Sequence, residues 1–152
     1  MAPRMASPVM VVPDALPALL TVSKVISKAG VPKETTDLVH LRVSQINGCA
    51  ACINMHSGDL GKSQTADQRL LMVAAWREAT CFSEAERAAL ALAEAVTRLS
   101  DRPDAVTDEV WEEAARHYDE QELGALVMSI GMVNLWNRIN VPVRQVPSTD
   151  WN

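Results

Sequence analysis

Apolar residues recur every three or four positions through most of the chain, which is the spacing of one face of an α-helix. No stretch alternates apolar and polar residues between turns, as a half-buried strand would. The pattern therefore predicts an all-α fold, a compact bundle of about six helices with short connections. The predicted helical segments are 16–26, 36–46, 49–60, 65–79, 83–99, 107–118 and 119–139.

Capping residues fix several of the predicted helix starts. Ser83 with Glu86, and Asp119 with Glu122, have the spacing of a capping box, in which the two residues bond each other's backbone N–H groups. Asp14 is the predicted N-cap of the first helix, and Thr35 or Thr36 that of the second.

The dipeptide Asn47-Gly48 interrupts the second predicted helix, because asparagine and glycine leave helical backbone angles most readily. A new helix then starts near Cys49 and has Cys49 and Cys52 in its first turn. The free N–H groups and the dipole of a helix N-terminus favour a thiolate at such a position. His56 lies four residues after Cys52, so all three side chains point to one side of the helix.

The length of 152 residues fits one domain, and the expected division is a flexible segment 1–13, a helical domain 14–141 and an irregular tail 142–152. A net charge of −5 argues against nucleic-acid binding, since no excess of Lys and Arg is present to neutralise phosphates. No apolar run reaches the roughly 18 to 20 residues of a membrane span, and the first residues do not resemble a secretion signal. We therefore expect a cytoplasmic protein.

A C-x-x-C pair with a nearby histidine admits three interpretations. The first is redox catalysis, in which one thiol attacks and the other closes a disulfide. The second is a zinc site, with Cys81 or His40 as the fourth ligand beside Cys49, Cys52 and His56. The third is that both cysteines are small buried apolar residues. We expect Cys81 to be a packing or surface residue and not a third redox thiol. We expect His40 and His117 to be solvated, because charged residues surround both histidines in the sequence.

The cysteine motif also resembles that of a known family. The stretch is Leu41-Arg-Val-Ser-Gln-Ile-Asn-Gly-Cys-Ala-Ala-Cys-Ile-Asn-Met-His56, and it is similar to the core motif of the AhpD-like alkylhydroperoxidases in the carboxymuconolactone decarboxylase superfamily. Further similar stretches begin at Trp76, Phe82 and Asn134, so the resemblance spans most of residues 35–140.

The resemblance implies a role for each site residue. Cys52 would attack the peroxide, Cys49 would resolve the product, and His56 would relay protons to and from Cys52. Asp37, twelve residues before Cys49, would be the carboxylate, where the family usually has Glu. Ala51 stands between the cysteines, where better studied members have a histidine.

The function implied is a thiol-dependent alkylhydroperoxidase or disulfide oxidoreductase of antioxidant defence, acting without metal or cofactor. Its partners would be a peroxide and an external dithiol or lipoyl-type reductant. The last helix is apolar over much of its circumference, which predicts a homo-oligomer, and family members form trimers or hexamers. The alternatives are a decarboxylase of the carboxymuconolactone type, a redox-sensing module and a zinc-binding module.

Overall fold

The computed structural model describes residues 2–60 and 69–147, and within them every regular element is a helix. The all-α prediction is confirmed. The helices are α1 (Pro8–Val11), α2 (Ala15–Ile26), α3 (Lys33–Asn47), α4 (Ala50–Leu60), the 3₁₀ helix η1 (Val73–Ala75), α6 (Glu84–Thr97), α7 (Asp108–Ala115) and α8 (Glu120–Asn140), with a further helical turn over residues 69–72.

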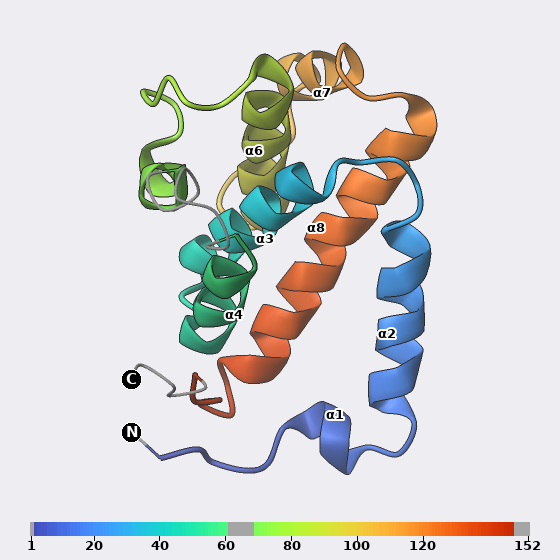
Figure 1. Ribbon diagram of the computed structural model, residues 1–152, viewed down its shortest axis with the longest axis vertical. Helices are drawn as coiled ribbons and strands as arrows, with labels where there is room; N and C mark the ends of the chain where they lie inside the picture. The colour runs from blue at the N-terminus through green and yellow to red at the C-terminus, as the bar shows by residue number, and fades with distance from the viewer. Residues whose placement is uncertain (1, 61–68, 148–152) are drawn as a thin grey trace.

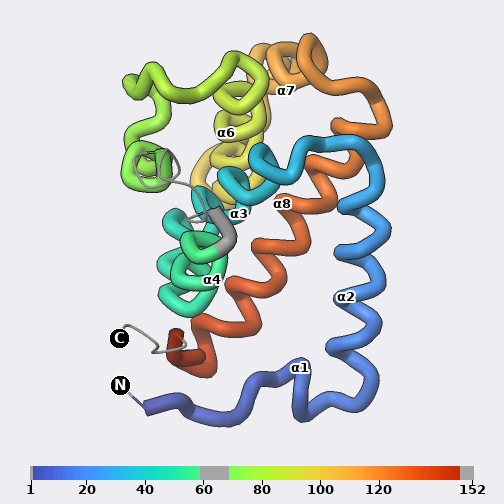
Figure 2. The backbone as a smooth tube through the Cα atoms, viewed as in Figure 1, coloured from blue at the N-terminus to red at the C-terminus, as the bar shows by residue number. Residues whose placement is uncertain are grey.

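Helix α8 is the central element of the bundle and contacts α2, α3, α4, α6 and α7 (Figure 1). In the same view α2 runs along one side of α8, while α3, α4 and α6 lie on the other side, and the backbone tube shows the same arrangement (Figure 2). Since neighbours surround α8, apolar residues are accommodated on several of its faces.

The core has two clusters, and α3 contributes to both. The larger one joins α3, α6 and α8, and its fully buried members include Val39, Leu92, Leu126 and Ile130. The smaller one joins α3 and α6 to the segment around η1, through Leu38, Leu41, Val73, Trp76, Phe82 and Leu90. Burial of side chains of this size stabilises the bundle by roughly 1.5–3 kcal/mol each.

A buried carboxylate ties the same three elements together. Glu94 of α6 accepts hydrogen bonds from the Trp76 indole (2.9 Å) and the Arg42 guanidinium (2.7 Å), and it pairs with Arg77. Burial raises the pKa of Glu94, but the hydrogen bonds from Trp76, Arg77 and Arg42 outweigh it and leave that pKa below its ordinary value.

The helix ends show which local predictions hold. Both capping boxes are formed, at Ser83 and at Asp119. The Asp14 side chain makes no capping hydrogen bond, and its backbone is left-handed, with φ 62°. Helix α3 begins at Lys33, so neither Thr35 nor Thr36 is the N-cap that the sequence predicted. Proline has no N–H for a hydrogen bond inside a helix, and Pro32 occupies the cap position directly before the helix.

The predicted helix 65–79 is only partly observed. Residues 65–68 lie outside the described part of the chain, and η1 follows the helical turn 69–72. Residues 76–78 form a turn instead of continuing the helix. The Arg87 side chain of α6 donates to the carbonyls of Trp76, Arg77 and Ala79. These hydrogen bonds hold the turn against α6.

The first residues include α1, which the apolar pattern did not predict, and Val9 in it is buried. The backbone N–H of Arg4 donates to the carbonyl of Val143 at 2.9 Å, and its guanidinium donates to that of Pro142 at 3.0 Å. The start of the described chain therefore contacts the segment after α8. No helix among the described residues has the length and apolar character needed to cross a bilayer.

Candidate redox site

The turn between α3 and α4 positions the cysteine pair. Gly48 has a left-handed backbone, with φ 67°, and ends α3. The Cys49 N–H donates back to the Ser44 carbonyl at 3.0 Å, while the Cys49 carbonyl accepts from the Ile53 N–H at 2.9 Å. Cys49 is thus the residue at which one helix ends and the next begins, as the Asn47-Gly48 break predicts.

Cys49 and Cys52 are joined by a disulfide, with their Cα atoms 5.3 Å apart. Each cysteine is only 2% exposed. Cys52 lies in the first turn of α4, and His56, 8% exposed, lies one turn later on the same helix. Three of the four predicted site residues therefore lie in, or directly before, the first two turns of α4.

Asn140, the last residue of α8, also reaches the cysteine pair. Its side-chain amide donates to Cys52 Sγ at 3.4 Å. Sequence reasoning missed this residue, because nothing in the local pattern of α8 relates it to a cysteine 88 positions away.

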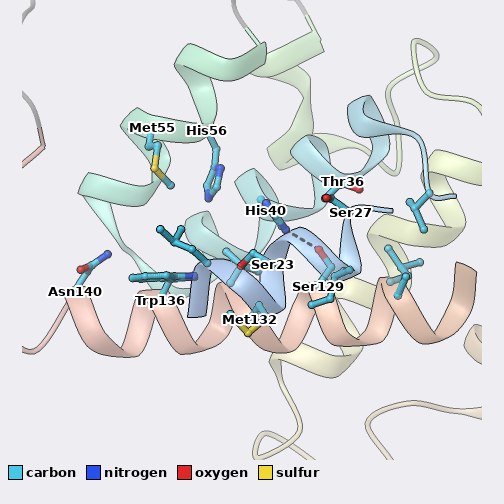
Figure 3. A pocket seen from close by; sticks show the side chains of 16 residues that line it. Ser23, Ser27, Thr36, His40, Met55, His56, Ser129, Met132, Trp136 and Asn140 are labelled. Carbon is cyan, nitrogen blue, oxygen red and sulfur yellow. Dashed lines mark hydrogen bonds between the residues drawn. The ribbon is translucent and has the colours of Figure 1, made fainter. Parts of the chain in front are cut away.

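A cavity of about 390 Å³ lies between α2, α3, α4 and α8 (Figure 3). Neither cysteine is among the residues that line it, but Asn140, which bonds Cys52, and His56 both are. Most of its wall is apolar: Leu20, Ile26, Val31, Met55, Ala125, Leu126, Met132, Val133 and Trp136. Its polar lining is Ser23, Ser27, Thr36, His40, His56, Ser129 and Asn140. Among the described residues that line it, none is Lys, Arg, Asp or Glu.

His40 of α3 lines this cavity, so the expectation that it is solvated is wrong. Its Nε2 lies 2.7 Å from the hydroxyl of Ser129 on α8, and its ring centroid lies 5.0 Å from that of His56 (Figure 3). Burial lowers the pKa of His40 to about 3, and repulsion from His56 and Lys33 acts in the same direction. His40 is consequently a neutral imidazole near pH 7. His117, by contrast, pairs with Glu113 on α7.

Asp37, the fourth predicted site residue, lies one turn before His40 on α3. Its carboxylate forms an ion pair with Lys33 at 2.5 Å, and its side chain is 13% exposed. It is not among the residues that line the cavity. The role of Asp37 stays a prediction.

A buried polar network holds α3 against α8 next to the site. The Asn47 amide donates to the side-chain oxygens of Asn134 and Asn137, both at 2.9 Å, and the Asn137 amide donates to the Ser44 hydroxyl at 3.1 Å. Ser44 and Asn47 belong to the last turn of α3, so the network fixes the turn that carries Cys49.

The third cysteine, Cys81, is free and exposed on the loop before α6. Among the side chains that the structure describes, no three of His, Cys, Asp or Glu are grouped so that they could hold a metal ion.

Comparison with known proteins identifies the family. The sequence model of the carboxymuconolactone decarboxylase family matches residues 13–95. The uncharacterized protein YdfG of Bacillus subtilis is 35% identical over 131 residues, which cover 86% of this chain and 88% of YdfG. The chain belongs to the carboxymuconolactone decarboxylase family. The uncharacterized protein YnjA of Escherichia coli is 37% identical over 103 residues, which are 68% of this chain and 55% of YnjA.

Solved structures place the chain in the AhpD-like part of this family. A protein of unknown function from Agrobacterium tumefaciens, described provisionally as the antioxidant defence protein AhpD, superposes with a TM-score of 0.89. It is 28% identical, and the match covers 98% of this chain and 100% of that one. The debrominase Bmp8 shares the fold, with a TM-score of 0.75 and 22% identity over 90% of this chain and 73% of its own.

Proposed function

We propose that this carboxymuconolactone decarboxylase family member is a thiol-dependent peroxidase that reduces organic hydroperoxides in antioxidant defence. The observation that carries the proposal is the position of the Cys49–Cys52 disulfide, next to an apolar cavity lined by His56. A disulfide of this kind is the product that such an enzyme leaves behind after each peroxide is reduced.

Cys52 is the attacking thiol in this proposal. His56 is one helical turn away and takes the thiol proton, and the helix N-terminus stabilises the thiolate. The Asn140 amide, at 3.4 Å from Cys52 Sγ, adds a hydrogen bond that favours the charged sulfur. Cys49 then attacks the oxidised Cys52 and closes the disulfide. Because the two cysteines are so close in the sequence, closing this ring costs little conformational entropy.

Asp37 is proposed as the carboxylate that balances the charge of the protonated imidazole. Since its carboxylate already pairs with Lys33, we expect Asp37→Asn to slow turnover less than His56→Gln does.

The cavity favours an uncharged substrate with an apolar organic group. About 390 Å³ with a mostly apolar wall accommodates an aryl or alkyl group, which gains free energy by leaving water. Decarboxylation of a lactone acid requires a bound carboxylate. No described cavity residue is a Lys or Arg that would pair with it, and a buried unpaired charge is costly.

The cycle is completed by an external dithiol, such as a lipoyl group, which reduces the disulfide by exchange. We propose that the chain needs no metal or cofactor for this cycle. A reducing compartment such as the cytoplasm supplies the reductant.

The test is steady-state reduction of cumene hydroperoxide and hydrogen peroxide with excess dihydrolipoamide. We expect faster turnover of cumene hydroperoxide, because only this substrate fills the cavity. Cys52→Ser should abolish turnover, and Cys81→Ser, which changes the exposed thiol, should leave it unchanged.

Undiminished peroxide turnover in Cys52→Ser would contradict the proposal. A single stoichiometric oxidation of the wild-type protein, with no further turnover in excess dithiol, would instead identify a redox sensor.

A further inference from the structure

A second histidine shares the cavity with His56. His40 comes from α3 and His56 from α4, and their rings are 5.0 Å apart with a tilt of 55°. Beyond His40 lies the Ser129 hydroxyl of α8, 2.7 Å from Nε2. Figure 3 shows His56, His40 and Ser129 following one another along the cavity. A row of groups that can each accept and donate a proton leads from the turn that carries Cys52 into the substrate space.

The proposed reaction needs a proton donor in that space. A thiolate attacks the terminal oxygen of a hydroperoxide in line with the O–O bond, so the leaving oxygen points away from the sulfur. The leaving oxygen carries the organic group, which the apolar wall of the cavity holds. An alkoxide is a strong base, and its departure is slow unless a proton reaches it as the O–O bond breaks.

We propose that His40, held by Ser129, is the cavity-side proton donor to this leaving oxygen and is reloaded from His56. This inference rests on the proposed peroxidase function and goes beyond it by assigning a second catalytic histidine. Ala51 leaves no histidine between the two cysteines, and His40 provides a second imidazole from a different helix.

Protons and electrons balance in this scheme. His56 takes the Cys52 thiol proton, and the thiolate forms the S–O bond while the O–O bond breaks. His40 gives one ring proton to the departing oxygen, which leaves as an alcohol, and regains a proton from His56. Cys49 then forms the S–S bond, and the sulfenic hydroxyl leaves with the Cys49 proton as water. Two thiols lose two electrons, and the peroxide gains them.

The surroundings of His40 keep it in the state that this step requires. Burial, together with the nearby His56 and Lys33, lowers the pKa of His40 to about 3. The ring is therefore neutral, with one nitrogen protonated. Nε2 is hydrogen-bonded to the Ser129 hydroxyl, which lines the cavity and can pass the proton on, while Nδ1 can receive one. The Ser129 hydroxyl holds the His40 ring in the cavity beside His56.

The experiment varies the leaving group. Fully reduced full-length protein in a Cys81→Ser background is mixed with cumene hydroperoxide or with peroxybenzoic acid at mildly acidic pH, and the single-turnover rate of thiol loss is measured. The two peroxides have aromatic groups of similar size. Peroxybenzoic acid releases a carboxylate, a far weaker base than an alkoxide, and needs no proton donor.

We expect His40→Gln to slow the reaction with cumene hydroperoxide at least about ten-fold and that with peroxybenzoic acid less than about two-fold. Ser129→Ala keeps both histidine rings. It should also slow the reaction with cumene hydroperoxide more than that with peroxybenzoic acid, but by less than His40→Gln does. The control is His117→Gln, a histidine outside the cavity, which should leave both rates unchanged.

Equal losses with both peroxides in His40→Gln, or no loss with either, would overturn the role of His40 and leave the peroxidase function standing. A wild-type protein that reacts with neither peroxide would overturn the proposed function itself, and the role of His40 with it.

Discussion

At the scale of single residues, the cysteine pair has a polar contact from a distant helix. Asn140 donates to Cys52 Sγ, and His56 follows Cys52 by one turn of α4. A charged sulfur accepts a hydrogen bond more strongly than a neutral one does. In the proposed cycle the Asn140 contact would therefore stabilise a Cys52 thiolate more than the thiol, and α8 would take part in the reaction.

We predict that Asn140→Leu slows alkylation of reduced Cys52 at neutral pH by about five- to ten-fold, since one hydrogen bond to a charged group is lost. The measurement is the iodoacetamide reaction rate in a Cys49→Ser, Cys81→Ser background, where Cys52 is the remaining thiol. Gln121→Leu, which removes an exposed amide at the other end of α8, is the control and should react as fast as the parent. An unchanged rate in Asn140→Leu would refute a role for this amide.

At the scale of helices, the α3–α8 contact decides where the cysteines lie. Ser44 and Asn47 at the end of α3 bond Asn137 and Asn134 of α8, and Asn137 is 1% exposed. Buried amides of this kind require partners, so the network permits essentially one alignment of the two helices. That alignment places Gly48, and with it the start of α4, beside the end of α8.

We predict that Asn137→Leu lowers the free energy of unfolding by about 2–3 kcal/mol, because it leaves polar groups of Ser44 and Asn47 without this buried partner. Urea unfolding of the oxidised protein measures the change. Gln121→Leu, on the exposed side of the same helix, should stay within about 0.5 kcal/mol of the wild type. A comparably small effect of Asn137→Leu would show that the network does not hold the helices.

At the scale of the whole molecule, α1 and α2 leave several large apolar residues in water. Helix α2 has no buried residue, and Leu20, Val25 and Met10 are 53%, 64% and 68% exposed. The prediction of an oligomer rests on the apolar last helix, which packs against five helices of its own chain and still leaves Met128 and Leu135 52% and 38% exposed. The exposed face of α2 now supports that prediction.

We predict that light scattering at micromolar concentration gives a mass above the 16.6 kDa of one chain. Val25→Asp, which puts a charge on the exposed apolar face of α2, should reduce that mass. Thr21→Asp adds the same charge at a polar position of α2 and should have the smaller effect. A single monomeric peak for the wild type would contradict the prediction.

The sequence by itself determined the features that depend on neighbours within a few residues. The capping boxes at Ser83 and Asp119 satisfy backbone groups three residues away, and Gly48 ends α3 through its own backbone conformation. The helical spacing of Cys49, Cys52 and His56 likewise follows from 3.6 residues per turn. The helical fold, the cysteine pair at a helix start and the family could therefore all be predicted from the chain alone.

Only the tertiary structure decided what surrounds that pair. The partners of Cys52 and His40, Asn140 and Ser129, lie 88 and 89 residues further along the chain. His40 has charged neighbours in the sequence and was expected in water, yet α2, α4 and α8 enclose the cavity that it lines. No local pattern specifies such contacts, because burial and hydrogen bonding between distant segments are fixed when the helices pack. The sequence located the cysteine pair, and the packing of α2, α3, α4 and α8 produced the cavity that His56 and Asn140 line.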